Sequence, residues 1–114
     1  MTVQVSRLVP GSVLTNAAAI YYTCPAATSA LIKRADFTNT SGSAVTVTVY
    51  MVPFGGSPAA SNTVMSAVAI APGVTYVSPE LSGQVLGPQE TLQAVCSANN
   101  SVTIMVSGLT IVGS

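Results

Sequence analysis

Hydrophobic and polar residues alternate along much of this chain, most clearly over residues 44–52. In the segment AVTVTVYMV, one parity holds Val45, Val47, Val49 and Met51, and the other holds Thr46, Thr48 and Tyr50. Period-two alternation with β-branched residues is typical of a strand with one buried face. The flanking segments, Ser41-Gly42-Ser43 and Pro53-Phe54-Gly55-Gly56, have turn chemistry. We therefore predict that residues 30–52 form a hairpin whose strands are 30–40 and 44–52.

The same pattern predicts strands in most of the remaining sequence. They lie at residues 12–15, 18–23, 63–70, 74–78, 84–86, 91–97 and 101–112. The turn Ala71-Pro72-Gly73 returns the chain from 63–70 to 74–78, and Leu92, Ala94 and Cys96 are expected to point inward. No apolar stripe at helical spacing runs for ten residues.

About eight short strands at regular spacing predict an all-β, single-domain antiparallel β-sandwich that is jelly-roll-like. Residues 1–16 are expected to be an N-terminal arm or edge strand, and residues 17–114 the β-sandwich domain.

The last predicted strand changes parity along its length. Val102, Ile104 and Val106 share one face, whereas Leu109 and Ile111 fall on the other. A one-residue insertion would restore a common inward face, so we predict a β-bulge at Gly108.

Ionic groups are almost absent. Charged residues make up 5% of the 114 residues, with three basic and three acidic side chains and no net charge, whereas an ordinary domain has about 25% charged residues. The mean hydropathy is +0.62. Either the exposed surface is covered with Ser and Thr, or it is buried against copies of the chain or a host scaffold. We favour burial, because neutral apolar monomers tend to associate. The missing positive charge also argues against nucleic acid as a partner.

The missing residue types exclude most catalytic chemistry. The chain has no His and no Trp, so Ser–His and Cys–His nucleophile pairs and imidazole metal ligands are excluded. Asp36, Glu80 and Glu90 are the only carboxylates available for an acid–base pair, and we interpret them as solvated or ion-paired groups. Gly55-Gly56 lacks the Lys-Ser/Thr that completes a phosphate loop. We expect no enzyme activity, no metal and no cofactor.

The cysteines and the apolar runs indicate in which cellular compartment the protein is made. The runs are too short for a membrane helix, and the N-terminus lacks a signal-peptide pattern, so we expect no membrane partner and synthesis in a cytoplasm. Cys24 and Cys96 have no metal-type spacing. They are expected to be free and buried, with a Cys24–Cys96 disulfide as the alternative.

Several charged and aromatic side chains are candidates for a subunit contact. Within the predicted strand, Lys33 is expected on one face, with Arg34 and Asp36 on the other. Arg34 and Asp36 are either a weak surface ion pair or a pair that fixes register at an interface.

The aromatic residues divide in a similar way. Phe37 is expected in the core, and Phe54, at a loop tip, is a candidate interface anchor. Tyr21 and Tyr22 are adjacent on a strand, so at least one is expected to point away from the core. The full set of interface candidates is Arg7, Tyr21, Tyr22, Arg34, Asp36, Phe54, Tyr76 and Glu80.

Short segments in a fixed order resemble a family of small structural proteins of tailed bacteriophages. They are Tyr21-Tyr22-Thr23 with Pro25-Ala26, Ile32-Lys33-Arg34, Thr38-Asn39-Thr40-Ser41, the alternation over 44–49, Val52-Pro53 with Gly55-Gly56, Ala71-Pro72-Gly73-Val74-Thr75-Tyr76, Pro79-Glu80-Leu81, Leu92-Gln93-Ala94 and Ser107-Gly108. Val74 stands where the family commonly has Glu.

The resemblance implies a jelly-roll-like cement or decoration protein. Such a protein forms a homodimer or homotrimer on the capsid surface and bridges subunits of the major capsid protein. A tail, fibre or adaptor component of the virion is the alternative in the same class. From other classes come a carbohydrate-binding sandwich or adhesin, with Tyr21, Tyr50 or Tyr76 stacking on sugar, and a pilin-like subunit.

Overall fold

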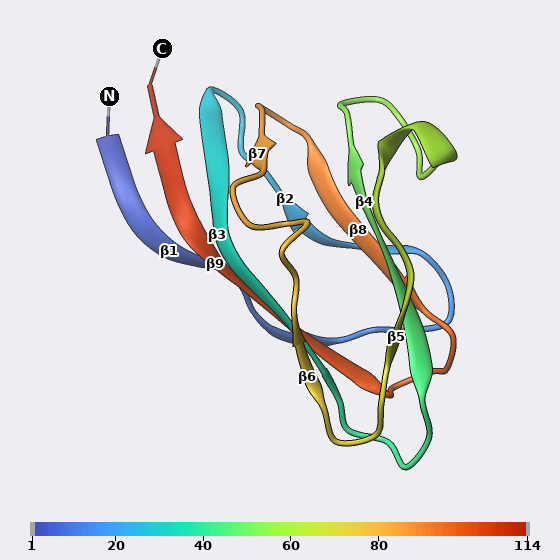
Figure 1. Ribbon diagram of the computed structural model, residues 1–114. Coiled ribbons are helices and arrows are strands. Elements are labelled where there is room, and N and C mark those ends of the chain that lie inside the picture. The colour runs from blue at the N-terminus through green and yellow to red at the C-terminus, as the bar shows by residue number, and fades with distance from the viewer. Residues whose placement is uncertain (1, 114) are drawn as a thin grey trace.

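The computed structural model describes residues 2–113, which form two antiparallel sheets packed face to face (Figure 1). Sheet A has the order β1 (Thr2–Val13), β9 (Val102–Val112), β3 (Thr28–Asn39) and β6 (Thr75–Val77), and β7 (Val85–Leu86) also pairs with β3. Sheet B has the order β2 (Ala19–Thr23), β8 (Thr91–Cys96), β4 (Val45–Val52) and β5 (Thr63–Ile70). A short 3-10 turn, η1 (Ala60–Asn62), precedes β5. The predicted single-domain antiparallel β-sandwich is confirmed, with nine strands among the described residues.

The core lies between the two sheets and contains the side chains that the alternation pointed inward. The buried side chains include Val45, Val47 and Val49 of β4 and the inward residues of β8, which confirms their predicted orientation. At the end of β4, however, Val52 is 1% exposed and Met51 is only half-buried. The register against β5 also shifts between Val49 and Tyr50, where β5 has one extra residue, Val64.

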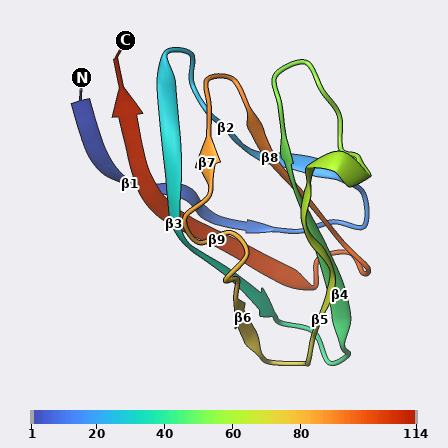
Figure 2. The ribbon, with the colours of Figure 1, turned by 45° about the horizontal axis from the view of Figure 1, so that its top comes forward.

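The predicted hairpin at 30–52 is wrong, because its two strands belong to different sheets. β3 pairs with β9, β6 and β7 in sheet A, whereas β4 pairs with β8 and β5 in sheet B. The turn at Ala71-Pro72-Gly73 likewise carries the chain from β5 in sheet B to β6 in sheet A. Both connections cross between the layers of the sandwich, as Figure 2 shows at the lower end of the molecule.

Asn39 holds these two crossings together. Its side chain is fully buried, and its amide donates to the carbonyls of Ser43 (2.8 Å) and Ile70 (2.9 Å). Its carbonyl oxygen accepts from the backbone N–H (2.9 Å) and the hydroxyl (2.7 Å) of Ser41. One side chain therefore ties the end of β3 to the end of β5 in the opposite sheet.

The bulge predicted at Gly108 lies instead in the strands on either side of it. Between the pairs Ile32–Gly108 and Arg34–Ser107, β3 has one extra residue, Lys33, and β9 has none. β1 also has extra residues where its register shifts between Arg7 and Ser12. Gly108 permits the close approach of β3, since a Cβ there would overlap the carbonyl oxygen of Leu31. β9 has no extra residue at this point, so Leu109 and Ile111 lie on the face opposite Val106.

β1 and β2 differ from the predicted segments in detail. No separate strand occurs at 12–15, because Ser12 and Val13 end β1 and Leu14 is fully buried in the core. In β2 a register shift against β8 makes Tyr21 the extra residue. Tyr21 and Tyr22 are consequently both half-buried and both pack against the core, so neither points fully away from it as predicted.

The cysteine prediction is confirmed. Cys24 and Cys96 are both free and buried, at 0% and 2% exposure. The Cys24 thiol donates to the carbonyl of Thr28 at 3.2 Å. Burial first, and the nearby Glu90 carboxylate second, raise the pKa of this thiol.

Candidate interaction surface on sheet A

The outer face of sheet A carries a continuous patch of hydrophobic side chains at the end where β1 starts and β9 finishes. Cross-strand pairing sets Val5 beside Leu109, Leu109 beside Leu31, and Leu31 beside Val85. A second row sets Val3 beside Ile111. We call this set the apolar band: Val3, Val5, Leu31, Val85, Leu109 and Ile111.

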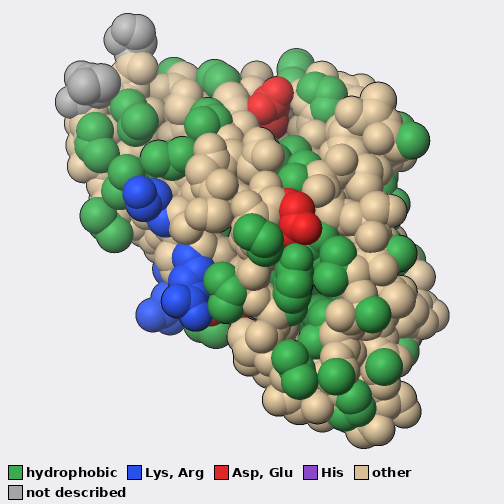
Figure 3. Space-filling model, in the orientation of Figure 1, with side chains coloured by type: hydrophobic (Ala, Val, Ile, Leu, Met, Phe, Trp, Pro, Cys, Tyr) green, Lys and Arg blue, Asp and Glu red, His purple; other side chains and the backbone are tan. Residues whose placement is uncertain are grey.

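The members of this band face away from the core because of strand parity. On β3 the inward residues Ala30 and Ile32 are fully buried, so Leu31 between them points outward. The outward side chains on the margins are the most accessible, with Val3 54%, Val5 81% and Val85 56% exposed. Hydrophobic side chains gather at the upper left of the molecule in Figure 3.

Next to the apolar band lies a basic band that holds all three Lys and Arg side chains of the chain. It consists of Arg7, Lys33 and Arg34, all exposed. Arg7 and Arg34 each pair with Ser107 from opposite sides, which brings β1 and β3 cations onto one row. In Figure 3 the basic side chains lie near one another at the left, in an upper and a lower group, and acidic side chains lie to their right.

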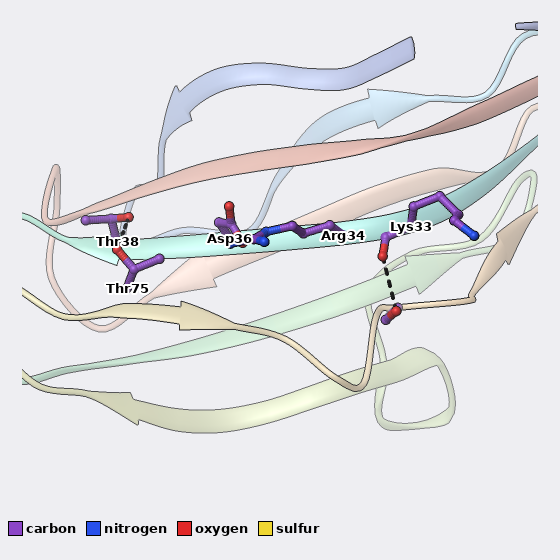
Figure 4. A network of polar contacts seen from close by, with 6 residues as sticks. Lys33, Arg34, Asp36, Thr38 and Thr75 are labelled. Carbon is purple, nitrogen blue, oxygen red and sulfur yellow. Dashed lines mark hydrogen bonds and ion pairs between the residues drawn. The ribbon is translucent and has the colours of Figure 1, made fainter. Parts of the chain in front are cut away.

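Strand β3 positions the polar groups of this face one after another (Figure 4). Arg34 Nε donates to Asp36 Oδ1 at 2.9 Å, while the Arg34 side chain remains 61% exposed. Lys33 does not lie opposite Arg34 as predicted, because the extra residue in β3 leaves both side chains exposed between Ile32 and Ala35 in the core.

The same face continues below the ion pair. Met105 and Val77 flank Asp36 on the neighbouring strands and are 39% and 47% exposed. The next row is made of hydroxyls, with Thr38 and Thr75 joined at 2.9 Å between their Oγ1 atoms. Along β3 from Leu31 to Thr38, this face is thus apolar, then basic, then mixed, then lined by hydroxyl groups.

A shallow recess of about 490 Å³ opens beside the basic band. Its lining residues are Lys33, Arg34, Val77, Ser78, Pro79 and Ser82. The Ser82 hydroxyl donates to the Lys33 carbonyl at 3.1 Å and fixes one wall. The lining contains no carboxylate and no thiol, so its groups can bind an acidic or hydroxyl side chain but provide no general base.

Tyr76 and Glu80 form a separate polar cluster at the edge of sheet A. The Glu80 carboxylate accepts from the Tyr76 hydroxyl at 2.9 Å and from the Ser78 hydroxyl at 3.1 Å. Hydrogen bonding from the residue's own backbone N–H first, and from Tyr76 and Ser78 as well, lowers the pKa of Glu80. Burial and the bond to Glu80 raise the pKa of Tyr76.

The structure brings together only part of the predicted interface set. Arg7, Arg34 and Asp36 share the outer face of sheet A. Tyr76 and Glu80 form the cluster just described. Phe54 is 70% exposed on the loop after β4 in sheet B, which agrees with its predicted place at a loop tip.

The apolar band was missed by sequence reasoning, although a signal for it was present. The opposite parity of Leu109 and Ile111 was interpreted as a bulge that would turn them inward. Without a bulge, the parity places Leu109 and Ile111 on the face opposite Val106, and they lie on that face in the structure.

The described residues contain no cluster of three or more His, Cys, Asp or Glu side chains suited to a metal ion. None of the elements in residues 2–113 is a helix long and apolar enough to cross a membrane.

Comparison with known proteins gives a fold but no family. No protein family matches the sequence, and no curated protein matches it. A chain from Bacillus endospore appendages, which form disulfide-linked pili, is similar with a TM-score of 0.60 and 15% identity, over 99% of this chain and 90% of that one.

Two viral chains are similar over a part of their length. A chain of infectious bursal disease virus, Gx strain, gives a TM-score of 0.51 at 14% identity, over 99% of this chain and 32% of the viral one. A chain of the T13 particle of the same virus gives 0.50 at 12% identity, over 96% and 30%. At such identities the likeness shows the β-sandwich fold alone.

Proposed function

We propose that this protein is a non-enzymatic structural subunit of a virion, a cement or decoration protein on the capsid of a tailed bacteriophage. Each copy would bridge neighbouring subunits of the major capsid protein and stabilise the shell additively. The observation that carries the proposal is the outer face of sheet A, where an exposed apolar band adjoins the three Lys and Arg side chains.

The charge distribution supports an interface on this face. Six charged side chains occur on a molecule with 5592 Å² of accessible surface. The fold is one that proteins of a pilus and of a virus particle also have. A surface with exposed aliphatic side chains and one basic row fits a protein partner whose contact is apolar at its centre and acidic at its rim.

The direct test is binding of the purified protein to undecorated capsids. We expect ordered density on the shell by cryo-electron microscopy, with the outer face of sheet A towards the capsid. Empty shells at saturating protein concentration would contradict the proposal, and density on the tail would select a tail, fibre or adaptor component instead.

A single substitution tests which face makes the contact. Met105→Glu places a second carboxylate beside Asp36 in the middle of the face, and we expect the affinity for the shell to fall about tenfold or more. Ser57→Glu adds the same charge at an exposed position of the loop after β4 in sheet B and is the matched control. Equal affinities of the two variants would place the contact elsewhere.

A subunit of a surface filament is the second candidate, favoured by the likeness to the endospore appendage chain over 99% of this chain. Intermolecular disulfides do not fit this chain, because both thiols are buried. Concentrated protein would then form non-covalent fibres that resist reductant, visible by negative-stain electron microscopy.

A further inference from the structure

Strand β1 leaves one edge of sheet A without a partner strand. It pairs with β9 alone, from the pair Thr2–Val112 to the pair Val13–Thr103. In Figures 1 and 2 no other strand lies beyond the start of β1 at the left of the molecule. Within residues 2–113, no segment other than β9 forms backbone hydrogen bonds with residues 2–7. Every second residue of an edge strand points its N–H and C=O outward, where they can pair with another strand.

The two halves of this edge differ in how they are protected. The second half has register shifts between Arg7 and Ser12 and contains Pro10, and bulges and proline both prevent pairing with a further strand. Residues 2–6 pair in regular register with β9, and they contain no proline and no charge. A regular, uncharged edge with exposed valines is the type that pairs with another chain.

We propose that residues 2–6 of β1 pair antiparallel with the same residues of a second copy, about a two-fold axis at Gln4. The two A sheets would then form one continuous sheet across the dimer. This contact specifies the self-association that belongs to the proposed function, but it can be tested without a capsid.

The sequence of the edge is self-complementary in this register. Pairing about Gln4 sets Val3 against Val5 of the second copy, and Thr2 against Ser6. Apolar side chains then meet on the outer face and polar ones on the inner face, which is the arrangement that fixes register. Moving the axis to Val5 would set Val3 against Arg7, and a one-residue shift would set Val3 against Ser6.

The apolar band supports a second copy as the occupant. A two-fold axis normal to the sheet keeps the outer faces of both copies on the same side. The row Val85, Leu31, Leu109 and Val5 therefore meets Val3 and Ile111 of the other copy, and the two bands join into one. The chain has no net charge to oppose this association.

Charge substitutions at the two valines test both the contact and its register. In the proposed pairing, Val3→Lys/Val5→Lys sets like charges directly opposite each other twice, so we expect the dimer dissociation constant to rise about tenfold or more. Val3→Lys/Val5→Glu sets opposite charges together twice and should restore the dimer. The control Ser57→Lys/Val74→Lys adds the same charge at exposed positions outside β1 and should dimerise as the unaltered chain does.

The measurement is solution mass by sedimentation equilibrium, with circular dichroism to confirm folding. A chain that remains monomeric at about 1 mM would overturn the proposal. A dimer that persists in Val3→Lys/Val5→Lys, or one that Val3→Lys/Val5→Glu fails to restore, would also overturn it.

A cysteine on the two-fold axis gives an independent test of register. Gln4→Cys would face its own copy across the axis, at a spacing that a disulfide can bridge, and we expect a covalent dimer on mild oxidation. Val74→Cys is the control and should stay uncrosslinked. Equal crosslinking of the two variants would contradict the proposed axis.

The outcomes separate this inference from the proposed function. If the unaltered chain decorates shells but remains monomeric in sedimentation equilibrium, only the proposed β1 pairing is contradicted. If the pairing is found and no shell is decorated, the pairing stands and the capsid role fails.

Discussion

Gly108 shows how a single residue determines whether two strands can approach each other. The extra residue of β3 at Lys33 brings the Leu31 carbonyl close to the Cα of Gly108. The neighbouring atoms are backbone, so they cannot move aside as the end of a flexible side chain would.

We expect Gly108→Ala to lower the free energy of unfolding by about 2 kcal/mol or more, because the added methyl group overlaps a backbone carbonyl. Gly42→Ala is the matched control, since a Cβ at Gly42 has nothing within 4 Å. Urea denaturation followed by circular dichroism measures both. Equal midpoints for the two variants would show that β3 and β9 separate without cost at this point.

At the scale of elements, the connections between the sheets depend on buried polar groups. β3 and β5 each end at a crossing from one sheet to the other, and Asn39 hydrogen-bonds to both crossings. Buried amides of this type stabilise a fold chiefly because leaving their partners unpaired is costly.

We expect Asn39→Ala to cost about 2–4 kcal/mol of stability, because it leaves the carbonyls of Ser43 and Ile70 without their donor. Asn99→Ala removes a single bond, to the N–H of Asn16 at an exposed site, and should cost less than about 1 kcal/mol. Chemical denaturation distinguishes the two. A small loss for Asn39→Ala would mean that water replaces its hydrogen bonds.

The sequence contains no side chain whose ordinary pKa lies near neutrality. It has no His, and the resolved shifts move pKa values away from pH 7. Glu80 has a native pKa below its usual 4.5, so its stabilising contribution is present above that pH and is lost as the pH falls through the native pKa. Cys24 and Tyr76 have native pKa values above 9.0 and 10.0, so their contributions are complete below those values and are lost as the pH rises.

We therefore expect a constant melting temperature from about pH 6 to about pH 8, with losses only outside that range. Differential scanning calorimetry across this range is the measurement. A change of more than about 3 °C within it would reveal a titrating group that the fold does not explain.

The sequence by itself determined the fold class, the inward residues of β8 and of β4 up to Val49, and the absence of histidine chemistry. Side-chain alternation reports which face of each strand is buried, and that information is local. Only the tertiary structure decided that β3 and β4 lie in different sheets, and that cations from β1 and β3 share one row. It also decided that Leu109 and Ile111 belong to an outer apolar band. Pairing partners are selected by long-range packing of whole faces, which the alternation within one strand does not encode.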